Sequence, residues 1–308
     1  MDVLVTGGAG FIGCHLVARL VQDGHRAIVL DDLSFGRIEN LAGLDVELIR
    51  ADVRDVGAHI EHLRGVRSVF HLAALVSSHD SLKQPERYIG TNLLGTLAVI
   101  RLCQSLEQPR LVFASSATVY GNTPEPARSE TDYPQPATVY AMTKLGAEQL
   151  IFMHREQAGY DDVSLRLFNV YGPKQNPDHP YANVTCKFSK AAAVGAPVSL
   201  YGDGQQSRDF VYIDDVVDAM LAVARAPTPR RVYNVGTGAD ASLAALLEMV
   251  QELGQTRLQV RREPPWPNDI RAIRADVTAI RTDVGWAPRV ELREGLRRTI
   301  DWFRAQAK

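Results

Sequence analysis

The chain has 308 residues, 45% of them hydrophobic and 23% charged, and its formal net charge is −2. This length suffices for two lobes or one large domain, and the near balance of charge excludes a general electrostatic attraction to nucleic acid. Cys14, Cys103 and Cys186 stand far apart, which argues against a disulfide framework or a zinc site and favours the reducing cytoplasm. No signal-peptide pattern opens the chain and no apolar run reaches about 18 residues, so we expect no membrane span.

Residues 3–24 predict a strand, a glycine turn and a helix. Residues 3–5 are apolar, Gly7, Gly10 and Gly13 follow at the spacing G-x-x-G-x-x-G, and apolar residues then recur at helical spacing up to Gly24. Glycines allow a tight turn and let main-chain N–H groups approach a pyrophosphate at the positive end of the helix. The spacing alone also suits a plain βα turn, but its place between a strand and a helix favours a dinucleotide site.

Strands and helices alternate through the first half of the chain. Further strands are predicted at residues 26–30, 46–49, 66–72 and 111–114, and helices at residues 92–106 and 140–159. This alternation predicts an α/β protein with a doubly wound parallel sheet, the Rossmann fold, in which ligands bind at the carboxyl ends of the strands.

Polar or small residues follow several of these strands. Asp31 ends the second strand, where a carboxylate accepts hydrogen bonds from the adenosine ribose and repels a 2′-phosphate, so it favours NAD over NADP. The alternative is that Asp31 and Asp32 only begin a turn. We expect Asp52 to contact the adenine edge. Ala73-Ala74 allow close approach of a cofactor, although they also suit simple packing.

The fifth strand leads into Ser115 and Ser116, and a proline-rich loop then reaches Tyr140 and Lys144. Tyr140 and Lys144 are four residues apart and share one face of the predicted helix. A lone Y-x-x-x-K usually marks an exposed helix start, but after a dinucleotide fold and a serine-bearing strand it favours catalysis. The apolar faces of helices 92–106 and 140–159 predict a homodimer through a four-helix contact.

Several motifs appear together, in this order: residues 6–13 (TGGAGFIG), 71–74 (HLAA), Asn92, 115–121 (SSATVYG), 140–144 (YAMTK), 166–173 (RLFNVYGP), 201–215 (YGDGQQSRDFVYIDD) and 233–238 (YNVGTG). In this combination the chain resembles the extended short-chain dehydrogenase/reductase family over nearly its whole length. Within that family it is similar to the NAD-dependent nucleotide-sugar epimerases and dehydratases, especially the UDP-glucose and UDP-N-acetylglucosamine 4-epimerases.

The resemblance implies a mechanism. Tyr140 is the expected acid/base, and the Lys144 ammonium and the positive nicotinamide ring are expected to lower its pKa from its usual value near 10. Lys144 also holds the nicotinamide ribose, and Ser116 bonds the sugar hydroxyl and relays its proton. The expected cofactor-binding residues are Gly7, Gly10, Phe11, Ile12, Gly13, Asp31, Asp32, Asp52, Val53, Leu72, Ala73, Ala74, Asn92, Ser115, Tyr140 and Lys144.

The residues after the catalytic serine bear on the reaction. Dehydratases of the family have Thr-Asp-Glu there, and decarboxylases have an acidic residue at the position of Thr118. This chain has Ser116-Ala117-Thr118, so it resembles the 4-epimerases. The alternatives are a nucleotide-sugar 4-ketoreductase or dehydrogenase, another epimerase such as a UDP-glucuronate 4-epimerase, and a catalytically silent binding module.

The second half of the chain is expected to bind the UDP-sugar. The expected substrate-binding residues are Ser116, Thr118, Asn169, Val184, Tyr201, Arg208, Asp269 and Arg271. Thr118 equally suits strand packing, and the alternative for Arg208 is a surface ion pair with Asp209. Trp266 and Asn268 depart from the family's Arg-x-Gly-Asp segment, which leaves the phosphate contact to Arg271. Ile273, of intermediate size, favours a pocket that accepts an N-acetyl group.

The two lobes are expected to interleave. Residues 1–166 with about 209–235 form the predicted NAD-binding domain, and about 167–208 with 236–308 form the predicted nucleotide-sugar lobe. Residues 210–215 return to the first lobe, a helix follows at 216–225, and further helices are predicted at 243–253 and 292–303.

Overall fold

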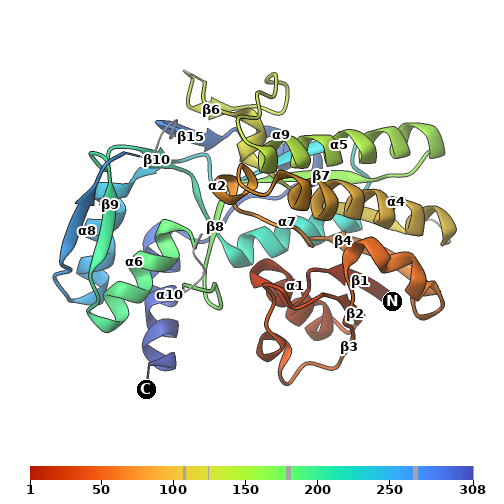
Figure 1. Cartoon of the computed structure of the whole chain (residues 1–308), viewed down its shortest axis with the longest axis horizontal. Coiled ribbons are helices and arrows are strands. Elements are labelled where there is room, and N and C mark those ends of the chain that lie inside the picture. Colours follow the sequence, from red (N-terminus) through yellow and green to blue (C-terminus); the bar gives the residue numbers. More distant parts are fainter. Residues whose placement is uncertain (107–108, 124, 178–181, 266–269, 308) are drawn as a thin grey trace.

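The computed structural model describes the chain except residues 107–108, 124, 178–181, 266–269 and 308. It confirms the Rossmann fold: a seven-stranded parallel sheet has the order β12-β7-β5-β4-β1-β2-β3 and is flanked by helices (Figure 1). Its strands are β1 (Asp2–Thr6), β2 (Arg26–Leu30), β3 (Val46–Ile49), β4 (Val66–His71), β5 (Arg110–Ser116), β7 (Val163–Leu167) and β12 (Val232–Val235). All neighbouring strands run parallel, so their carboxyl ends share one edge.

The two faces of the sheet are covered by different helices. Val3 and Val5 pack in one core cluster with α1 (Phe11–Gln22) and α7 (Ile213–Arg225), whereas Leu4 packs in another with α4 (Gly95–Ser105) and α5 (Val139–Ala158). Successive strand residues point to opposite faces, and burial of both faces explains why β1 is an unbroken apolar run.

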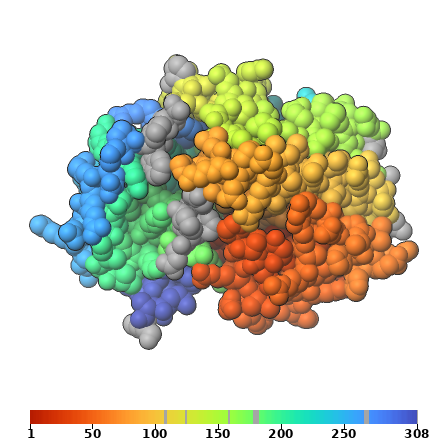
Figure 2. Space-filling view, in the orientation of Figure 1, coloured from red at the N-terminus to blue at the C-terminus, as the bar shows by residue number. Residues whose placement is uncertain are grey.

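A smaller lobe lies beside the carboxyl edge of the sheet, drawn in green and blue in Figures 1 and 2. Its larger sheet has the order β13-β10-β15-β6, and β14 pairs with β9. The strands of this lobe are β6 (Ala127–Arg128), β9 (Val198–Tyr201), β10 (Ser207–Arg208), β13 (Ala241–Ser242), β14 (Val260–Glu263) and β15 (Ala272–Ala275), and its helices are α6 (Val184–Val194), α8 (Leu243–Gly254) and α10 (Leu292–Gln306). Helix α9 (Thr278–Val284) packs instead against β12 of the seven-stranded sheet.

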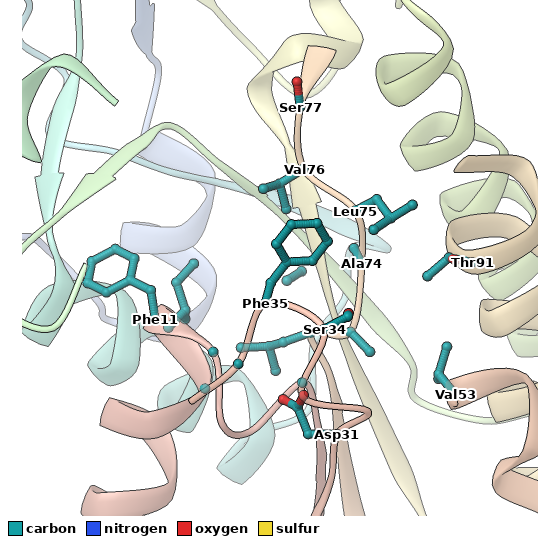
Figure 3. Close-up of a pocket in the computed structure, with 18 of the residues that line it drawn as sticks. Phe11, Asp31, Ser34, Phe35, Val53, Ala74, Leu75, Val76, Ser77 and Thr91 are labelled. Atoms are coloured by element: carbon teal, nitrogen blue, oxygen red, sulfur yellow. The ribbon is translucent and has the colours of Figure 1, made fainter. Parts of the chain in front are cut away.

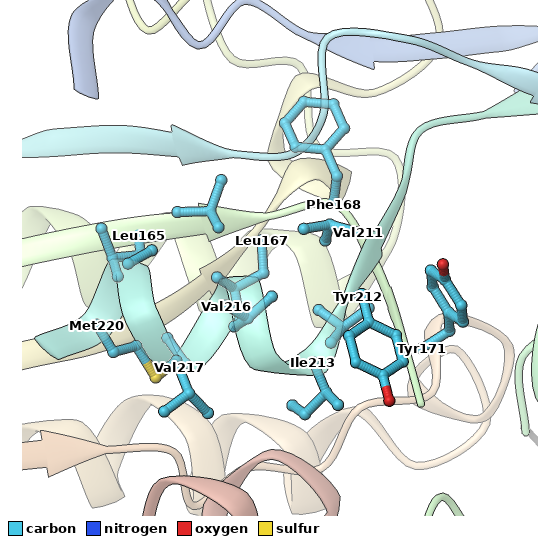
Figure 4. Close-up of a cluster of buried hydrophobic side chains, with 14 of the residues drawn as sticks. Leu165, Leu167, Phe168, Tyr171, Val211, Tyr212, Ile213, Val216, Val217 and Met220 are labelled. Atoms are coloured by element: carbon cyan, nitrogen blue, oxygen red, sulfur yellow. The ribbon is translucent and has the colours of Figure 1, made fainter. Parts of the chain in front are cut away.

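The chain crosses between the lobes at a parallel pair of strands, β8 (Asn169–Tyr171) and β11 (Phe210–Tyr212). Figure 4 shows the apolar side chains at this junction, where Phe168 and Val211 lie near one another and α7 carries Val216 below them. A segment near the end of the chain also fastens α7, because Asp215 accepts the backbone N–H groups of Arg289 and Val290 at 3.0 Å. We call this contact the clasp.

Several elements differ from their predicted bounds. The predicted helix 92–106 is divided into a π-helix, Ile89–Leu94, and α4. Helix α7 begins at Ile213, three residues earlier than predicted. Strand β6 lies in the segment expected to belong to the NAD-binding domain but pairs with β15 of the smaller lobe; the domain limits stay a prediction. Among the described residues, no helix has the length and apolar character needed to cross a membrane.

Candidate active site

The glycine turn after β1 is shaped by close backbone contacts. Gly7 has a φ of +71°, in the left-handed region, and a Cβ there would lie 2.7 Å from Ala73 N. A Cβ on Gly13 would overlap the Gly7 carbonyl oxygen. Only glycine therefore fits, and α1 begins at Phe11 with no side-chain cap from Gly10. The unbonded N–H groups of the first turn form an anion site of the kind that binds pyrophosphate.

A cavity of about 650 Å³ opens at this turn and runs along the carboxyl ends of the strands. Its size is that of a pocket for a large organic ligand. Figure 3 shows Phe11 on one side, Asp31 at the base, and Ala74, Leu75 and Val76 along a second wall. Of the expected cofactor-binding residues, these line it: Gly7, Gly10, Phe11, Ile12, Gly13, Asp31, Asp32, Asp52, Val53, Leu72, Ala73, Ala74, Ser115, Tyr140 and Lys144.

Asp31 is 7% exposed and fixes the glycine turn. Its carboxylate accepts the Ala9 N–H at 3.0 Å and the Leu33 N–H at 2.9 Å. Burial raises its pKa, and these two hydrogen bonds oppose that rise. Asp52, by contrast, is paired with the Arg54 guanidinium at 2.7–2.9 Å, which lowers its pKa.

Tyr140 and Ser116 meet at the far end of the cavity. Burial raises the pKa of the Tyr140 hydroxyl to about 12, while its hydrogen bond with Ser116 acts in the opposite direction. Thr118 donates its hydroxyl to Ser116 Oγ at 2.9 Å, so it is joined to the site rather than packed in a strand. Its segment is a short 3₁₀ helix, Ala117–Tyr120.

Lys144 is held against β5, and its expected effect on Tyr140 stays a prediction. Its amino group donates to the Ala114 carbonyl at 2.8 Å and lies 4.7 Å from the centre of the Phe113 ring. Burial lowers the pKa of Lys144 to about 7, and the charge of Glu148 opposes that change. The Lys144 amino group is thus anchored to the end of the strand that carries Ser116.

A buried polar network lies behind these residues. Arg166 donates two hydrogen bonds to Glu148, at 3.1 and 2.8 Å, and Ser115 donates its hydroxyl to the same carboxylate. Next to them, the fully buried His71 lies between Thr6 and Thr96 at 2.8 and 2.9 Å. Sequence reasoning missed Glu148, although its position four residues after Lys144 was a usable signal.

Asn92 lies beside the cavity but does not line it, and its side chain joins two neighbouring segments. Its side-chain oxygen accepts the Leu75 N–H at 2.8 Å, and its amide donates to the Leu75 carbonyl and to Thr143 Oγ1 at 3.0 Å. This network ties α5 to the wall of the cavity. A cofactor contact for Asn92 stays a prediction.

Lys174 is a further cavity residue that sequence reasoning missed. It follows β8 in the left-handed region, with a φ of +63°, and its amino group donates to the Asn40 carbonyl at 3.1 Å. The preceding Pro173 carbonyl bonds His15 of α1 at 3.0 Å. These two hydrogen bonds connect the loop after β8 to α1 and to the segment that contains Asn40, next to the glycine turn.

Ser116 and Thr118 follow β5, whereas the other expected substrate residues lie at the junction and in the facing lobe; of the whole set, Ser116 alone lines the described part of this cavity. Asn169 donates to the Asp209 carbonyl, Arg208 to the Ser207 and Ile270 carbonyls, and Arg271 pairs with Asp203. Val184 begins α6 and Tyr201 ends β9. Ile273 is 3% exposed within the core cluster. Asp269, Trp266 and Asn268 lie outside the described residues.

The site fits a dinucleotide: the turn accepts no Cβ, the helix start is uncapped, and a buried carboxylate ends β2. These features define a dinucleotide-dependent enzyme of the extended short-chain dehydrogenase/reductase type. The family model for the "NAD dependent epimerase/dehydratase family" matches residues 3–236, and the chain belongs to this family. NAD is its cofactor.

Curated relatives match this chain over nearly its full length. The chain is 36% identical to the UDP-glucose 4-epimerase of Mycolicibacterium smegmatis, with 100% of both chains covered. It is also 31% identical to UDP-glucuronic acid decarboxylase 1 of Arabidopsis thaliana, over 99% of this chain and 70% of that protein. The relatives therefore establish an enzyme of the nucleotide-sugar epimerase/dehydratase class.

Solved structures match the whole chain as well. The UDP-glucose 4-epimerase of Thermotoga maritima with UDP-glucose has a TM-score of 0.95 at 33% identity, covering 100% of both chains. The UDP-N-acetylglucosamine 4-epimerase of Methanobrevibacter ruminantium, in complex with UDP-N-acetylmuramic acid, has 0.94 at 34%, covering 99% and 98%. The Thermus thermophilus UDP-glucose 4-epimerase complex with NAD has 0.90 at 37%, covering 99% of both.

Proposed function

We propose that this chain is an NAD-dependent UDP-sugar 4-epimerase, acting on UDP-glucose and UDP-galactose, on UDP-N-acetylglucosamine and UDP-N-acetylgalactosamine, or on both pairs. The observation that carries the proposal is the segment Ser116-Ala117-Thr118 next to Tyr140. Elimination of water needs an acid and a base at the neighbouring sugar carbons, and here those positions hold a methyl group and a hydroxyl.

The carboxylates in the described lining support the same conclusion. Asp31, Asp32 and Asp52 follow β2 and β3, at the end of the cavity away from Tyr140, and Asp80 of α2 (Ser78–Ser81) accepts the Gln84 amide at 3.0 Å. The group bonded to Tyr140 is the Ser116 hydroxyl, which in turn accepts the Thr118 hydroxyl, and hydroxyl groups move a proton to and from oxygen.

Tyr140 and Ser116 perform the proton transfer. Tyr140, as a phenolate, takes the proton of the C4 hydroxyl, and Ser116 bonds that hydroxyl and holds its orientation. When bound, NAD⁺ would supply reversible hydride acceptance at C4 of the sugar. Lys144 orients the ribose and adds positive charge near the phenolate. Because the net redox change is zero, firm cofactor retention suits this reaction.

Product stereochemistry tests the proposal. The purified protein is incubated separately with UDP-glucose, UDP-N-acetylglucosamine and UDP-glucuronate, and the configuration at C4 is determined by NMR. We expect inversion at C4 for one or both of the first two sugars without added cofactor. Inversion of UDP-glucuronate alone would make the protein a uronate epimerase, and net consumption of NADPH would make it a 4-ketoreductase.

Tyr140→Phe tests the assigned base. We expect a loss of at least about 100-fold in turnover, because removing a general acid/base typically costs 10²–10⁴-fold. The cofactor released on denaturation should remain NAD in amounts equal to the unaltered protein. An active Tyr140→Phe protein would contradict the assignment.

A further inference from the structure

Lys174 is a half-buried cation in the lining of the cavity, and its hydrogen-bond partner is a neutral carbonyl group. Its amino group donates to the Asn40 carbonyl at 3.1 Å, and among the described residues no carboxylate pairs with it. An ammonium group withdrawn from water is costly unless it is paired with an opposite charge. The Lys174 side chain is therefore suited to bind an anion that enters the cavity.

The contact with Asn40 places the Lys174 amino group beside the glycine turn. The Asn40 side-chain amide donates to the carbonyl of Ala9, a residue of that turn, at 2.9 Å. The Lys174 charge also reaches α1: burial lowers the pKa of His15, and the positive charge of Lys174 adds to that change. The ammonium group thus lies close to the helix start where the anion site is formed.

The backbone around Lys174 is fixed by the fold. Its φ of +63° lies in the left-handed region, which a non-glycine residue keeps only where the surrounding structure holds it. Here the Pro173 carbonyl accepts from His15 Nε2–H at 3.0 Å, and the preceding strand β8 is paired with β11. Lys174 is therefore presented to the cavity from a defined position.

The other basic residues of the described lining are engaged elsewhere or exposed. Arg54 is paired with a carboxylate after β3, and Lys144 is bonded to the end of β5. Arg87 belongs to α3 (Pro85–Tyr88) and lies 5.9 Å from the centre of an aromatic ring. Arg37 follows the turn after β2 and is exposed, whereas Lys174 is half-buried.

We propose that Lys174 binds the pyrophosphate of NAD and so holds the cofactor from the loop after β8, at the junction of the two lobes. Each phosphate group of the dinucleotide is negatively charged, and the N–H groups of a helix start supply only partial positive charges. A lysine ammonium adds a full charge and is a common ligand of phosphate. The inference concerns the cofactor and does not depend on which sugar is the substrate.

Cofactor exchange tests the proposal on the NAD-loaded protein. The protein is mixed with an excess of NAD deuterated in its nicotinamide ring, and the cofactor that remains bound is identified at intervals by mass spectrometry. Lys174→Gln and Lys174→Arg both keep an N–H donor for the Asn40 carbonyl, but only the second keeps the positive charge. This readout requires no turnover.

Lys174→Gln should exchange NAD about ten- to a hundredfold faster than the unaltered protein, because a bond to a charged group is lost and such losses act mainly on dissociation. Lys174→Arg should stay within about threefold of the unaltered rate, because it keeps the charge. Lys187→Gln, the same substitution at an exposed position of α6 outside the described lining, is the matched control and should leave the rate unchanged.

The diphosphate of a UDP-sugar is the other possible source of the anion, and calorimetry with UDP distinguishes the two. In the NAD-loaded protein, Lys174→Gln should change the Kd of UDP by less than about threefold, the usual limit for a side chain that makes no contact. The location of the Lys174 amino group beside the glycine turn is the reason for this expectation.

Three results would overturn the proposal. One is an unchanged exchange rate in Lys174→Gln. Another is equally fast exchange in Lys174→Gln and Lys174→Arg, which would assign the effect to the shape of the side chain. The third is weaker UDP binding with unchanged NAD exchange, which would assign Lys174 to the substrate. If Lys174→Gln is purified without cofactor while Lys174→Arg retains it, that difference is itself the expected loss of retention.

Discussion

His71 should make the folded protein sensitive to mild acid. Thr96 donates its hydroxyl to the Asn92 carbonyl at 2.6 Å, so it accepts from His71 Nε2–H, and His71 Nδ1 then accepts the Thr6 hydroxyl. Both ring nitrogens are satisfied in the neutral form. Burial, followed by the positive charge of Lys144, lowers the pKa of His71 to about 3, from 6.5.

The size of the effect follows from these two values. Because the folded pKa is the lower one, the unfolded chain binds more protons below pH 6.5, and stability falls as pH decreases through that range. Between pH 7 and pH 5 this one group removes about 2 kcal/mol from the free energy of unfolding. The loss continues until pH reaches the folded pKa near 3.

His71→Gln isolates the contribution, since glutamine accepts and donates as the neutral imidazole does but does not titrate. Urea unfolding of both proteins with excess NAD, at pH 7 and pH 5, gives their stability difference at each pH. We expect that difference to shrink by about 2 kcal/mol at pH 5. His62→Gln, whose parent side chain is 63% exposed, should change the pH dependence by less than about 0.5 kcal/mol. An identical difference at both pH values for His71→Gln would refute the reasoning.

Three further predictions concern stability, cofactor choice and assembly. Asp209→Ala removes the acceptor of the Thr237, Gly238 and Ala275 N–H groups and should cost about 3–9 kcal/mol in urea unfolding, at about 1–3 kcal/mol for each unsatisfied donor. Asp31→Ser should weaken NAD binding, measured by calorimetry, by about ten- to a hundredfold and reduce the preference over NADP. The chain should sediment at twice its mass of 33.9 kDa, and Leu94→Asp, at a 52% exposed leucine beside α4, should give monomers.

Each of these three predictions has a matched control variant. Asp203→Ala removes an exposed carboxylate paired with Arg271 and should change stability by less than about 0.5 kcal/mol. Asp32→Ser, at an exposed position, should affect cofactor choice less than Asp31→Ser. Val194→Asp, at the exposed end of α6, should leave the sedimentation unchanged. A dimer that survives Leu94→Asp would count against the predicted four-helix contact.

The cofactor half of the site was predictable because its signals are local. Gly7, Gly10 and Gly13 form one turn, Asp31 ends one strand, and Tyr140 and Lys144 share one helix; the parallel sheet then brings these short segments to one edge. The bounds of β2 and β3 match the predicted strands for the same reason, since apolar runs between turn residues mark them.

The features of the fold and the site that the sequence did not predict depend on contacts between distant parts of the chain. The π-helix that contains Asn92 is tied by side-chain bonds to Leu75 and Thr143, which no local pattern predicts. The smaller lobe is built from strands of two to four residues whose partners lie far away, such as Ser207 opposite Ala272. The orientation of Lys144 toward Ala114 depends equally on tertiary packing.

The clasp on α7 has a consequence for how the protein is made. Strand β12 and the Arg289–Val290 backbone that bonds Asp215 are synthesised after the other six strands of the large sheet, yet β12 completes that sheet and the backbone fastens α7. A chain still attached to the ribosome therefore carries an open sheet edge at β7, and such edges invite pairing with other chains. We expect a stop codon before residue 232, which removes β12 and the residues that bond Asp215, to yield aggregation rather than a smaller NAD-binding protein.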